Sequence, residues 1–168
     1  MAHGSANFSR MEAKTPRDSQ AVVADLMMPH HANGLRPASV FGGVILSMMD
    51  RCAGLSAVRH AGGQASTLSI DRVLFKEPIR TGEFVEMRAR VVYVGRTSMS
   101  IMVDVYAEDI PTGHRRHTNE CWLTFVRLDD QGRPCPVPPL RLETSEDERL
   151  HAIAARRREQ ALAERERG

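Results

Sequence analysis

The sequence has few of the residues that build cross-linked or metal-bound folds. Its three cysteines are widely spaced along the chain: Cys52, Cys121 and Cys135. They give neither a disulfide framework nor a CxxC half-site for a metal ion. Two histidine pairs have no third ligand at a usable spacing: His30 with His31, and His114 with His117. We therefore expect Cys52 and Cys121 to be small core residues, and we expect no metal site.

The chain also lacks long apolar runs and a strong excess of either charge. The chain has no run of about 18 apolar residues, the length needed to span a bilayer. Its N-terminus has no apolar signal-peptide core. We therefore expect a cytoplasmic protein without a membrane partner. The formal net charge is +2, and lysine occurs only at Lys14 and Lys76. The other basic residues are arginines. A preference for arginine over lysine can reflect phosphate binding, because the guanidinium binds phosphate oxygens, but coding bias in the genome gives the same preference. Acids are interspersed, and no basic stripe alternates with aromatics, so nucleic acid is not an expected partner.

The length of 168 residues fits one ordinary domain with extensions. Residues 1–18 are polar and predict a disordered N-terminal tail. Residues 19–142 would form the domain, and residues 143–168 a charged C-terminal helix with Ser145 and Glu148 as a capping box. The apolar stripe of this helix is narrow, and consists of Leu150, Ile153 and Ala154. We expect the helix to be solvated or loosely docked.

Hydrophobic alternation predicts strands from residue 65 to residue 128, after a first strand at 20–28. Between them lies a helix over residues 42–60, which Gly62 would end. One long helix and several antiparallel strands, each with one apolar face, predict an α+β fold. The simplest packing is a curved antiparallel sheet wrapped around the helix. Such a sheet leaves strand edges open, which edge-to-edge pairing in a dimer would cover.

The long helix contains one acid, Asp50, in a segment where nearly every residue from Gly43 to Ala57 is apolar or small. A helix that is apolar all round belongs in a core, and a buried carboxylate is costly without a partner or a task. Two interpretations stay open. Asp50 pairs with Arg51, Arg59 or a neighbouring hydroxyl and holds the core in register, or it directs water in catalysis.

Two glycines, Gly42 and Gly43, open the same helix, where unpaired backbone N–H groups attract a developing negative charge. Gly42 and Asp50 are roughly 12 Å apart along the axis, at about 1.5 Å per residue. One thioester or ester carbonyl cannot meet both groups of a single chain. Two such helices running antiparallel across a two-fold axis would bring Gly42 of one chain near Asp50 of the other. The site is therefore expected to need a homodimer.

A series of short motifs runs in order from about residue 20 to about residue 140. It consists of Met28–Asn33, Phe41–Gly43 with Met49 and Asp50, Arg59 with His60, Phe75 with Pro78, Ile79 and Gly82, Val94–Met99, Thr112 with Gly113, Thr124–Val126 and Pro136–Pro138. In order and rough spacing the series resembles the hotdog-fold acyl-CoA thioesterases. In particular, it resembles the acyl-CoA hydrolases related to the bacterial YciA and mammalian brain-type enzymes.

The resemblance implies a hotdog fold and hydrolysis of acyl-CoA thioesters to a free carboxylic acid and CoA. It implies no cofactor, since CoA is part of substrate and product, and a homodimer that in the family commonly assembles into trimers of dimers. Asp50 would orient and deprotonate the attacking water or, as an alternative, attack the carbonyl directly. The Gly42 N–H would stabilise the oxyanion, with Gly43 allowing close approach. Asn33 would position water or the thioester.

Two further features follow from the resemblance. The segment that in the family lies along CoA is matched by Gly95, Arg96, Thr97 and Ser98, with Arg96 as the candidate phosphate contact. The loop at residues 34–40 is two residues longer than is usual in the family. Strict positional alignment would put Leu35 where the family has its asparagine, and Leu35 cannot do that work.

Two other functions remain alternatives. A hotdog domain can bind acyl-CoA as a sensor without hydrolysing it, although a sensor has no need of the acid Asp50. A hotdog dehydratase or hydratase usually places a histidine beside the acid. His60 is at the far end of the helix from its N-terminus, which disfavours that reaction.

Overall fold

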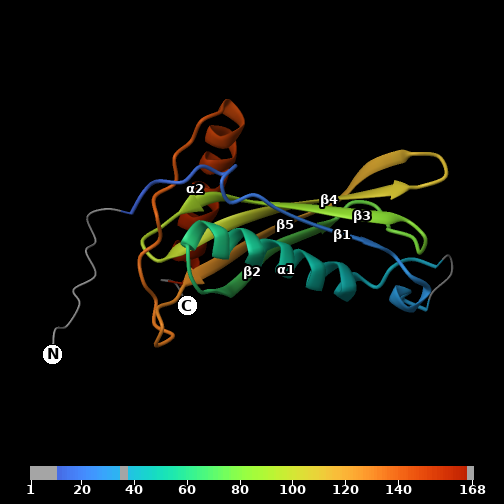
Figure 1. The fold of residues 1–168 in the computed structure, drawn as a ribbon, viewed down its shortest axis with the longest axis horizontal. Coiled ribbons are helices and arrows are strands. Elements are labelled where there is room, and N and C mark those ends of the chain that lie inside the picture. Colours follow the sequence, from blue (N-terminus) through green and yellow to red (C-terminus); the bar gives the residue numbers. More distant parts are fainter. Residues whose placement is uncertain (1–10, 35–37, 166–168) are drawn as a thin grey trace.

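Five strands form a single antiparallel sheet in the order β1-β3-β4-β5-β2. Figure 1 shows the fold in a computed structural model, which describes residues 11–34 and 38–165. The elements are β1 (Ala21–Leu26), the short 3-10 helix η2 (Pro29–His31), α1 (Gly42–Ala61), β2 (Ala65–Phe75), β3 (Phe84–Val94), β4 (Ser98–Asp109), β5 (His114–Arg127) and α2 (Ser145–Arg165). The predicted α+β arrangement of a sheet around one long helix is confirmed.

Helix α1 lies along one face of the sheet (Figure 1). It ends at Gly62, whose φ of 62° is left-handed and whose N–H bonds to the carbonyl of Val58. One side of the helix is buried against the strands, and Met49 and Cys52 are 0% exposed. The other side is open: Leu55 is 47% and Val58 46% exposed. The prediction of a wholly buried helix is therefore wrong for the single chain, because the sheet covers only one side of α1.

Helix α2 packs on the outer face of the sheet, so the prediction of a solvated or loosely docked helix is wrong. Leu150 and Ala154 are each 2% exposed and join a cluster with Val92, Met102 and Trp122. A register shift between Val91 and Tyr93 interrupts the alternation of β3, so that Val92 and Tyr93 both join the outer cluster while Val91 faces the core. The capping box lies one residue earlier than predicted. It joins Thr144 to Asp147 in both directions, each bond 3.1 Å long.

Residues 11–18, predicted as part of a disordered tail, are held against the domain. The Lys14 N–H bonds to the Pro139 carbonyl and the Arg141 N–H to the Lys14 carbonyl, both at 2.9 Å. Thr15 is 3% and Ser19 0% exposed. The tail prediction is wrong for this segment because its backbone pairs with the extended proline-rich stretch near residue 139. Residues 1–10 lie outside the described residues.

No helix in residues 11–34 and 38–165 is long and apolar enough to cross a membrane. The cytoplasmic location stays a prediction. Cys52 and Cys121 are core residues as predicted, and burial raises the pKa of their thiols to about 11 and about 12.

Candidate functional site

Helix α1 begins with backbone amides that no side chain caps. The N-cap residue Phe41 makes no side-chain hydrogen bond, and the first turn contains no acid. Within the described part of the chain, no hydrogen bond takes up the N–H of Gly42 or of Gly43. These amides lie at the positive end of the helix dipole, where they can receive an oxyanion.

The two glycines have different surroundings. A Cβ atom at Gly43 would lie 2.4 Å from Cε1 of Phe41, so only glycine admits the Phe41 ring at that place. A Cβ atom at Gly42 would lie 3.5 Å from the Phe75 ring, an ordinary contact. Gly43 therefore allows the ring of Phe41 to approach the backbone closely. Gly42 is the glycine that has open space beside it.

Asp50 is half-buried in the middle of α1 and bonds to a hydroxyl. Thr67, near the start of β2, donates to Asp50 Oδ1 at 2.8 Å. Of the structural pairings considered for Asp50, the one with a neighbouring hydroxyl is observed. An ion pair with Arg51 or Arg59 is not, because none of the salt bridges among the described residues includes Asp50. The guanidinium of Arg59 instead donates to the carbonyl of Gln20. Asp50 therefore presents a carboxylate that one hydroxyl orients.

Asn33 lies beside the start of α1 despite the longer loop. Its backbone N–H bonds to the Ser39 carbonyl at 2.9 Å, and its Nδ2 donates to the Ser39 hydroxyl at 2.6 Å. The carbonyl of His31 in turn receives the N–H of Phe41 at 2.8 Å. The loop is thus closed next to Gly42. Leu35 lies outside the described residues.

A cavity of about 280 Å³ lies beside the first turn of α1. Ser39, Gly42, Ile45, Phe75 and Asn119 contribute to its wall. Asp50 is not among the residues that line it. The structure therefore brings Gly42 and the loop of Asn33 together at one end of the helix. It leaves Asp50 two turns further along, as expected from the position of both residues on one helix.

The segment from Gly95 to Ser98 joins β3 to β4 and lies against α2. Arg158 donates to the Ser98 hydroxyl at 2.8 Å, and a Cβ atom at Gly95 would lie 3.0 Å from Arg158 Nη2. The Arg96 and Thr97 carbonyls receive backbone N–H groups, while the Arg96 side chain is exposed. Figure 1 shows this hairpin near the C-terminal end of α1. Within a single chain, the β3–β4 hairpin is therefore at the opposite end of α1 from Gly42.

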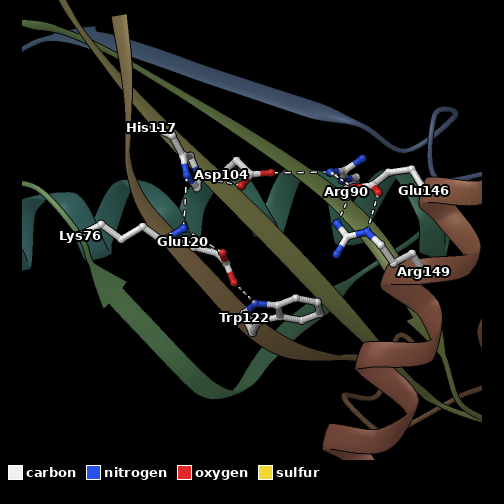
Figure 2. Close-up of polar contacts among 8 residues, drawn as sticks. All are labelled: Lys76, Arg90, Asp104, His117, Glu120, Trp122, Glu146 and Arg149. Atoms are coloured by element: carbon white, nitrogen blue, oxygen red, sulfur yellow. Dashed lines mark hydrogen bonds and ion pairs between the residues drawn. The ribbon is translucent and has the colours of Figure 1, made fainter.

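The outer face of the sheet has its own polar network (Figure 2). His117 contacts Asp104 Oδ1 at 2.9 Å through Nε2 and Lys76 Nζ at 3.3 Å through Nδ1. Arg90 links Asp104 to Glu146 at the start of α2, at 3.7 and 3.6 Å. In Figure 2 helix α1 lies behind the strands that bear these side chains. The network therefore ties α2 to the sheet. No group of three metal-ligating side chains occurs among the described residues.

Comparison with known proteins agrees with this geometry. Residues 38–114 match the Thioesterase superfamily. An uncharacterized acyl-CoA thioester hydrolase of Bacillus subtilis, YkhA, is 36% identical over 146 residues, which cover 87% of this chain and 84% of that protein. The chain belongs to the acyl-CoA thioester hydrolases. Like the solved members of this family, this hydrolase has the hotdog fold, with its sheet wrapped around α1.

Solved structures of acyl-CoA hydrolases superpose closely on this one. The enzyme from Bacillus cereus has a TM-score of 0.87 at 34% identity, and covers 93% of this chain and 94% of its own. The Staphylococcus aureus enzyme, in complex with butyryl coenzyme A, coenzyme A and coenzyme A disulfide, has a TM-score of 0.84 at 31% identity, with coverages of 91% and 92%. An apo-hexameric acyl-CoA thioesterase has a TM-score of 0.84 at 36% identity, with coverages of 89% and 94%.

The S. aureus hydrolase has also been solved with an asparagine, an aspartate or a threonine replaced by alanine. Its aspartate and threonine are 17 residues apart in sequence. Sequence reasoning did not single out Thr67 in the present hydrolase. No local motif marks a threonine on a strand, and only its hydrogen bond to Asp50 reveals it.

Proposed function

We propose that Asp50 and Gly42 of two copies of this acyl-CoA thioester hydrolase form one catalytic site. The observation that carries the proposal is the Asp50 carboxylate, which accepts the Thr67 hydroxyl at 2.8 Å and has no ion-pair partner among the described residues. Asp50 and Thr67 are 17 residues apart, the spacing of the aspartate and threonine that were replaced in the S. aureus hydrolase. Thr67 thus joins the site as a positioning residue for the carboxylate.

Asp50 acts as general base. It takes a proton from a water molecule, which attacks the thioester carbonyl carbon. The carbonyl oxygen becomes an oxyanion that accepts a hydrogen bond from the Gly42 N–H, a donor commonly worth a few kcal/mol. The C–S bond then breaks, CoA leaves as the thiol with the proton from Asp50, and the acyl group leaves as the acid. Asn33 positions the water or the thioester. These steps use no cofactor.

The site needs two copies of the chain. Gly42 and Asp50 are roughly 12 Å apart along α1, too far for one carbonyl and its attacking water. The open side of α1 and the edge strand β2 both expose apolar side chains: Leu55, Val58, Leu68 and Ile70 are 40–55% exposed. A second copy would cover them and bring its Asp50 to Gly42. The hexameric neighbours fit an assembly of three such dimers.

CoA would extend along the β3–β4 hairpin of the assembled protein. Arg96 is the proposed phosphate contact, because its guanidinium is exposed and has no salt bridge among the described residues. Gly95, Thr97 and Ser98 would shape this surface through their backbone, since the Ser98 hydroxyl already binds Arg158.

The mechanism is tested by replacing the acid. Asp50→Asn keeps the side-chain shape and removes the base, so we expect turnover to fall by about three orders of magnitude. Thr67→Val should lower kcat roughly tenfold through loss of the carboxylate orientation. The measurement is thiol release from butyryl-CoA, with circular dichroism to verify folding.

Asp71→Asn is a matched control. Asp71 is also a carboxylate held by hydroxyls, those of Ser69 at 2.5 Å and Thr124 at 2.8 Å, and it should be dispensable for turnover. Undiminished turnover in Asp50→Asn would refute the catalytic assignment. Tight acyl-CoA binding by the wild type with no thiol released would instead identify a sensor.

A further inference from the structure

Asn119 is a polar residue on the core-facing side of β5. Residues at two-residue spacing along this strand, Cys121, Leu123 and Phe125, point into the core and are at most 2% exposed. Asn119 continues the series and is itself 1% exposed. A β-bulge just before it, between Val105 and Tyr106 of the paired strand, ends the regular alternation. An amide thus occupies a position where this face of the sheet otherwise has apolar side chains.

The side-chain oxygen of Asn119 has no hydrogen-bond partner in the part of the chain that the structure describes. Its Oδ1 is buried and makes no hydrogen bond within residues 11–34 and 38–165. Folded proteins pair nearly all of their buried polar atoms, because an unpaired acceptor loses its hydration without compensation. An acceptor left open in this way points to a donor that comes from outside the chain.

Asn119, the residue with the open acceptor, lies at the cavity beside the start of α1. Asn119 and Gly42 both line this cavity of about 280 Å³. The wall also contains the buried apolar side chains of Val40, Ile45 and Ile79, which are 8%, 2% and 4% exposed, and the polar residues Ser39, Lys76 and Glu77. A thioester whose carbonyl oxygen bonds to the Gly42 N–H would place its neighbouring carbon atoms here.

We propose that Asn119 determines acyl specificity by accepting a hydrogen bond from a hydroxyl on the acyl chain. The inference rests on the proposed function of Gly42. Buried apolar side chains beside an open hydrogen-bond acceptor suit a short hydrocarbon chain that bears a polar substituent. A site built to bind a substrate hydroxyl rejects the analogue that lacks it, since its buried polar group is then unpaired. The favoured substrates are therefore short hydroxyacyl-CoA thioesters.

The test compares butyryl-CoA with 2-hydroxybutyryl-CoA and 3-hydroxybutyryl-CoA. The wild type should have the higher kcat/KM for at least one hydroxylated substrate. Asn119→Leu, similar in size but without the acceptor, should lower kcat/KM for that substrate roughly tenfold and leave butyryl-CoA hydrolysis unchanged or faster. Because Oδ1 makes no hydrogen bond to any described residue of the chain, the same change should not lower the melting temperature.

Thr118→Val is the matched control. It removes a buried hydroxyl that donates to the Val105 carbonyl, next to Asn119 in the same strand, and should leave the substrate preference unchanged. If Asn119→Leu does not fold, the smaller Asn119→Ala replaces it. Equal losses on all three substrates, or a wild type without preference, would overturn the inference. Butyryl-CoA turnover by the wild type tests the proposed function separately.

Discussion

His60 joins three segments of the chain at the end of α1. Its ring is fully buried, with Nε2 3.0 Å from the Pro138 carbonyl and Nδ1 3.3 Å from the Ser19 hydroxyl. A carbonyl only accepts, so Nε2 carries the proton and Nδ1 receives the hydroxyl of Ser19. This neutral ring is a structural residue, which agrees with the view that His60 takes no part in a dehydratase site.

The burial of His60 predicts a pH-dependent stability. Burial lowers its pKa from the ordinary value of 6.5. Below that pH the unfolded chain binds a proton that the folded chain does not, so the contribution of His60 is intact above pH 6.5 and is lost as the pH falls. We expect the melting temperature to drop between pH 7.5 and pH 5.5, and to drop less in His60→Gln. The exposed His30→Gln should behave as the wild type. Equal slopes in all three proteins would refute this role.

Single residues differ in how far the sequence reveals them. Asp50 is recognisable because it is an acid in an apolar helix. Thr67 is not, because its partner is set by the place of β2 beside α1, 17 residues along the chain. Asn119 resembles any polar residue of an alternating strand, and only its burial shows that it faces the core. Partners distant in sequence depend on packing, which a local pattern does not contain.

The first turn of α1 allows the oxyanion donor to be removed without disturbing the helix. Gly42 is the first helical residue, where proline is favoured, and Phe41 before it is extended at φ −62° and ψ 126°, as a residue before proline prefers. Gly42→Pro should therefore keep the fold and lower kcat by 10²–10³-fold, by about the effect of losing one oxyanion donor.

Gly42→Ala is the control for this substitution. It keeps the N–H, and its Cβ would make only an ordinary 3.5 Å contact with Phe75. Thiol release and the helical circular dichroism signal are measured for both variants. A folded Gly42→Pro protein with normal kcat would show that another group binds the oxyanion.

Elements with a regular period were predictable, and those that depend on irregularity were not. The strands and α1 follow from periods of two and from a glycine stop at Gly62. The docking of α2 depends on the β-bulge that places Tyr93 beside Val92 on the outer face and on the niche at Gly95 for Arg158. Neither feature can be recognised in the sequence of α2. Its apolar stripe, which contains Leu150, is too narrow to predict that the helix packs on the sheet.

The single chain exposes large apolar side chains on α1 and on the edge strand β2. Leu55 on α1, and Leu68 and Phe75 on β2, are 47%, 55% and 55% exposed. An edge strand of 11 residues with such side chains is a template for pairing with a second chain. The distance between Gly42 and Asp50 predicted a dimer from the sequence, and we propose that the second copy binds to these exposed surfaces.

Disruption of this surface should reduce assembly and turnover together. Leu55→Arg places a charge on the open side of α1, so we expect a smaller particle by light scattering and at least tenfold lower turnover of butyryl-CoA. Leu162→Arg, at an exposed position on α2, should change neither. A monomeric Leu55→Arg protein with full turnover would contradict a shared site.

The position of Trp122 gives the molecule a built-in optical reporter. It is the only tryptophan in the sequence, and it lies beneath α2 with the Arg157 guanidinium 4.2 Å from its ring and its indole N–H bonded to Glu120 at 2.7 Å. Its emission spectrum therefore reports whether α2 is packed on the sheet. It does not report on the opposite face of the sheet, where the thioester would bind. A red shift that precedes loss of the far-ultraviolet signal on heating would mark that helix lifting away before the domain melts.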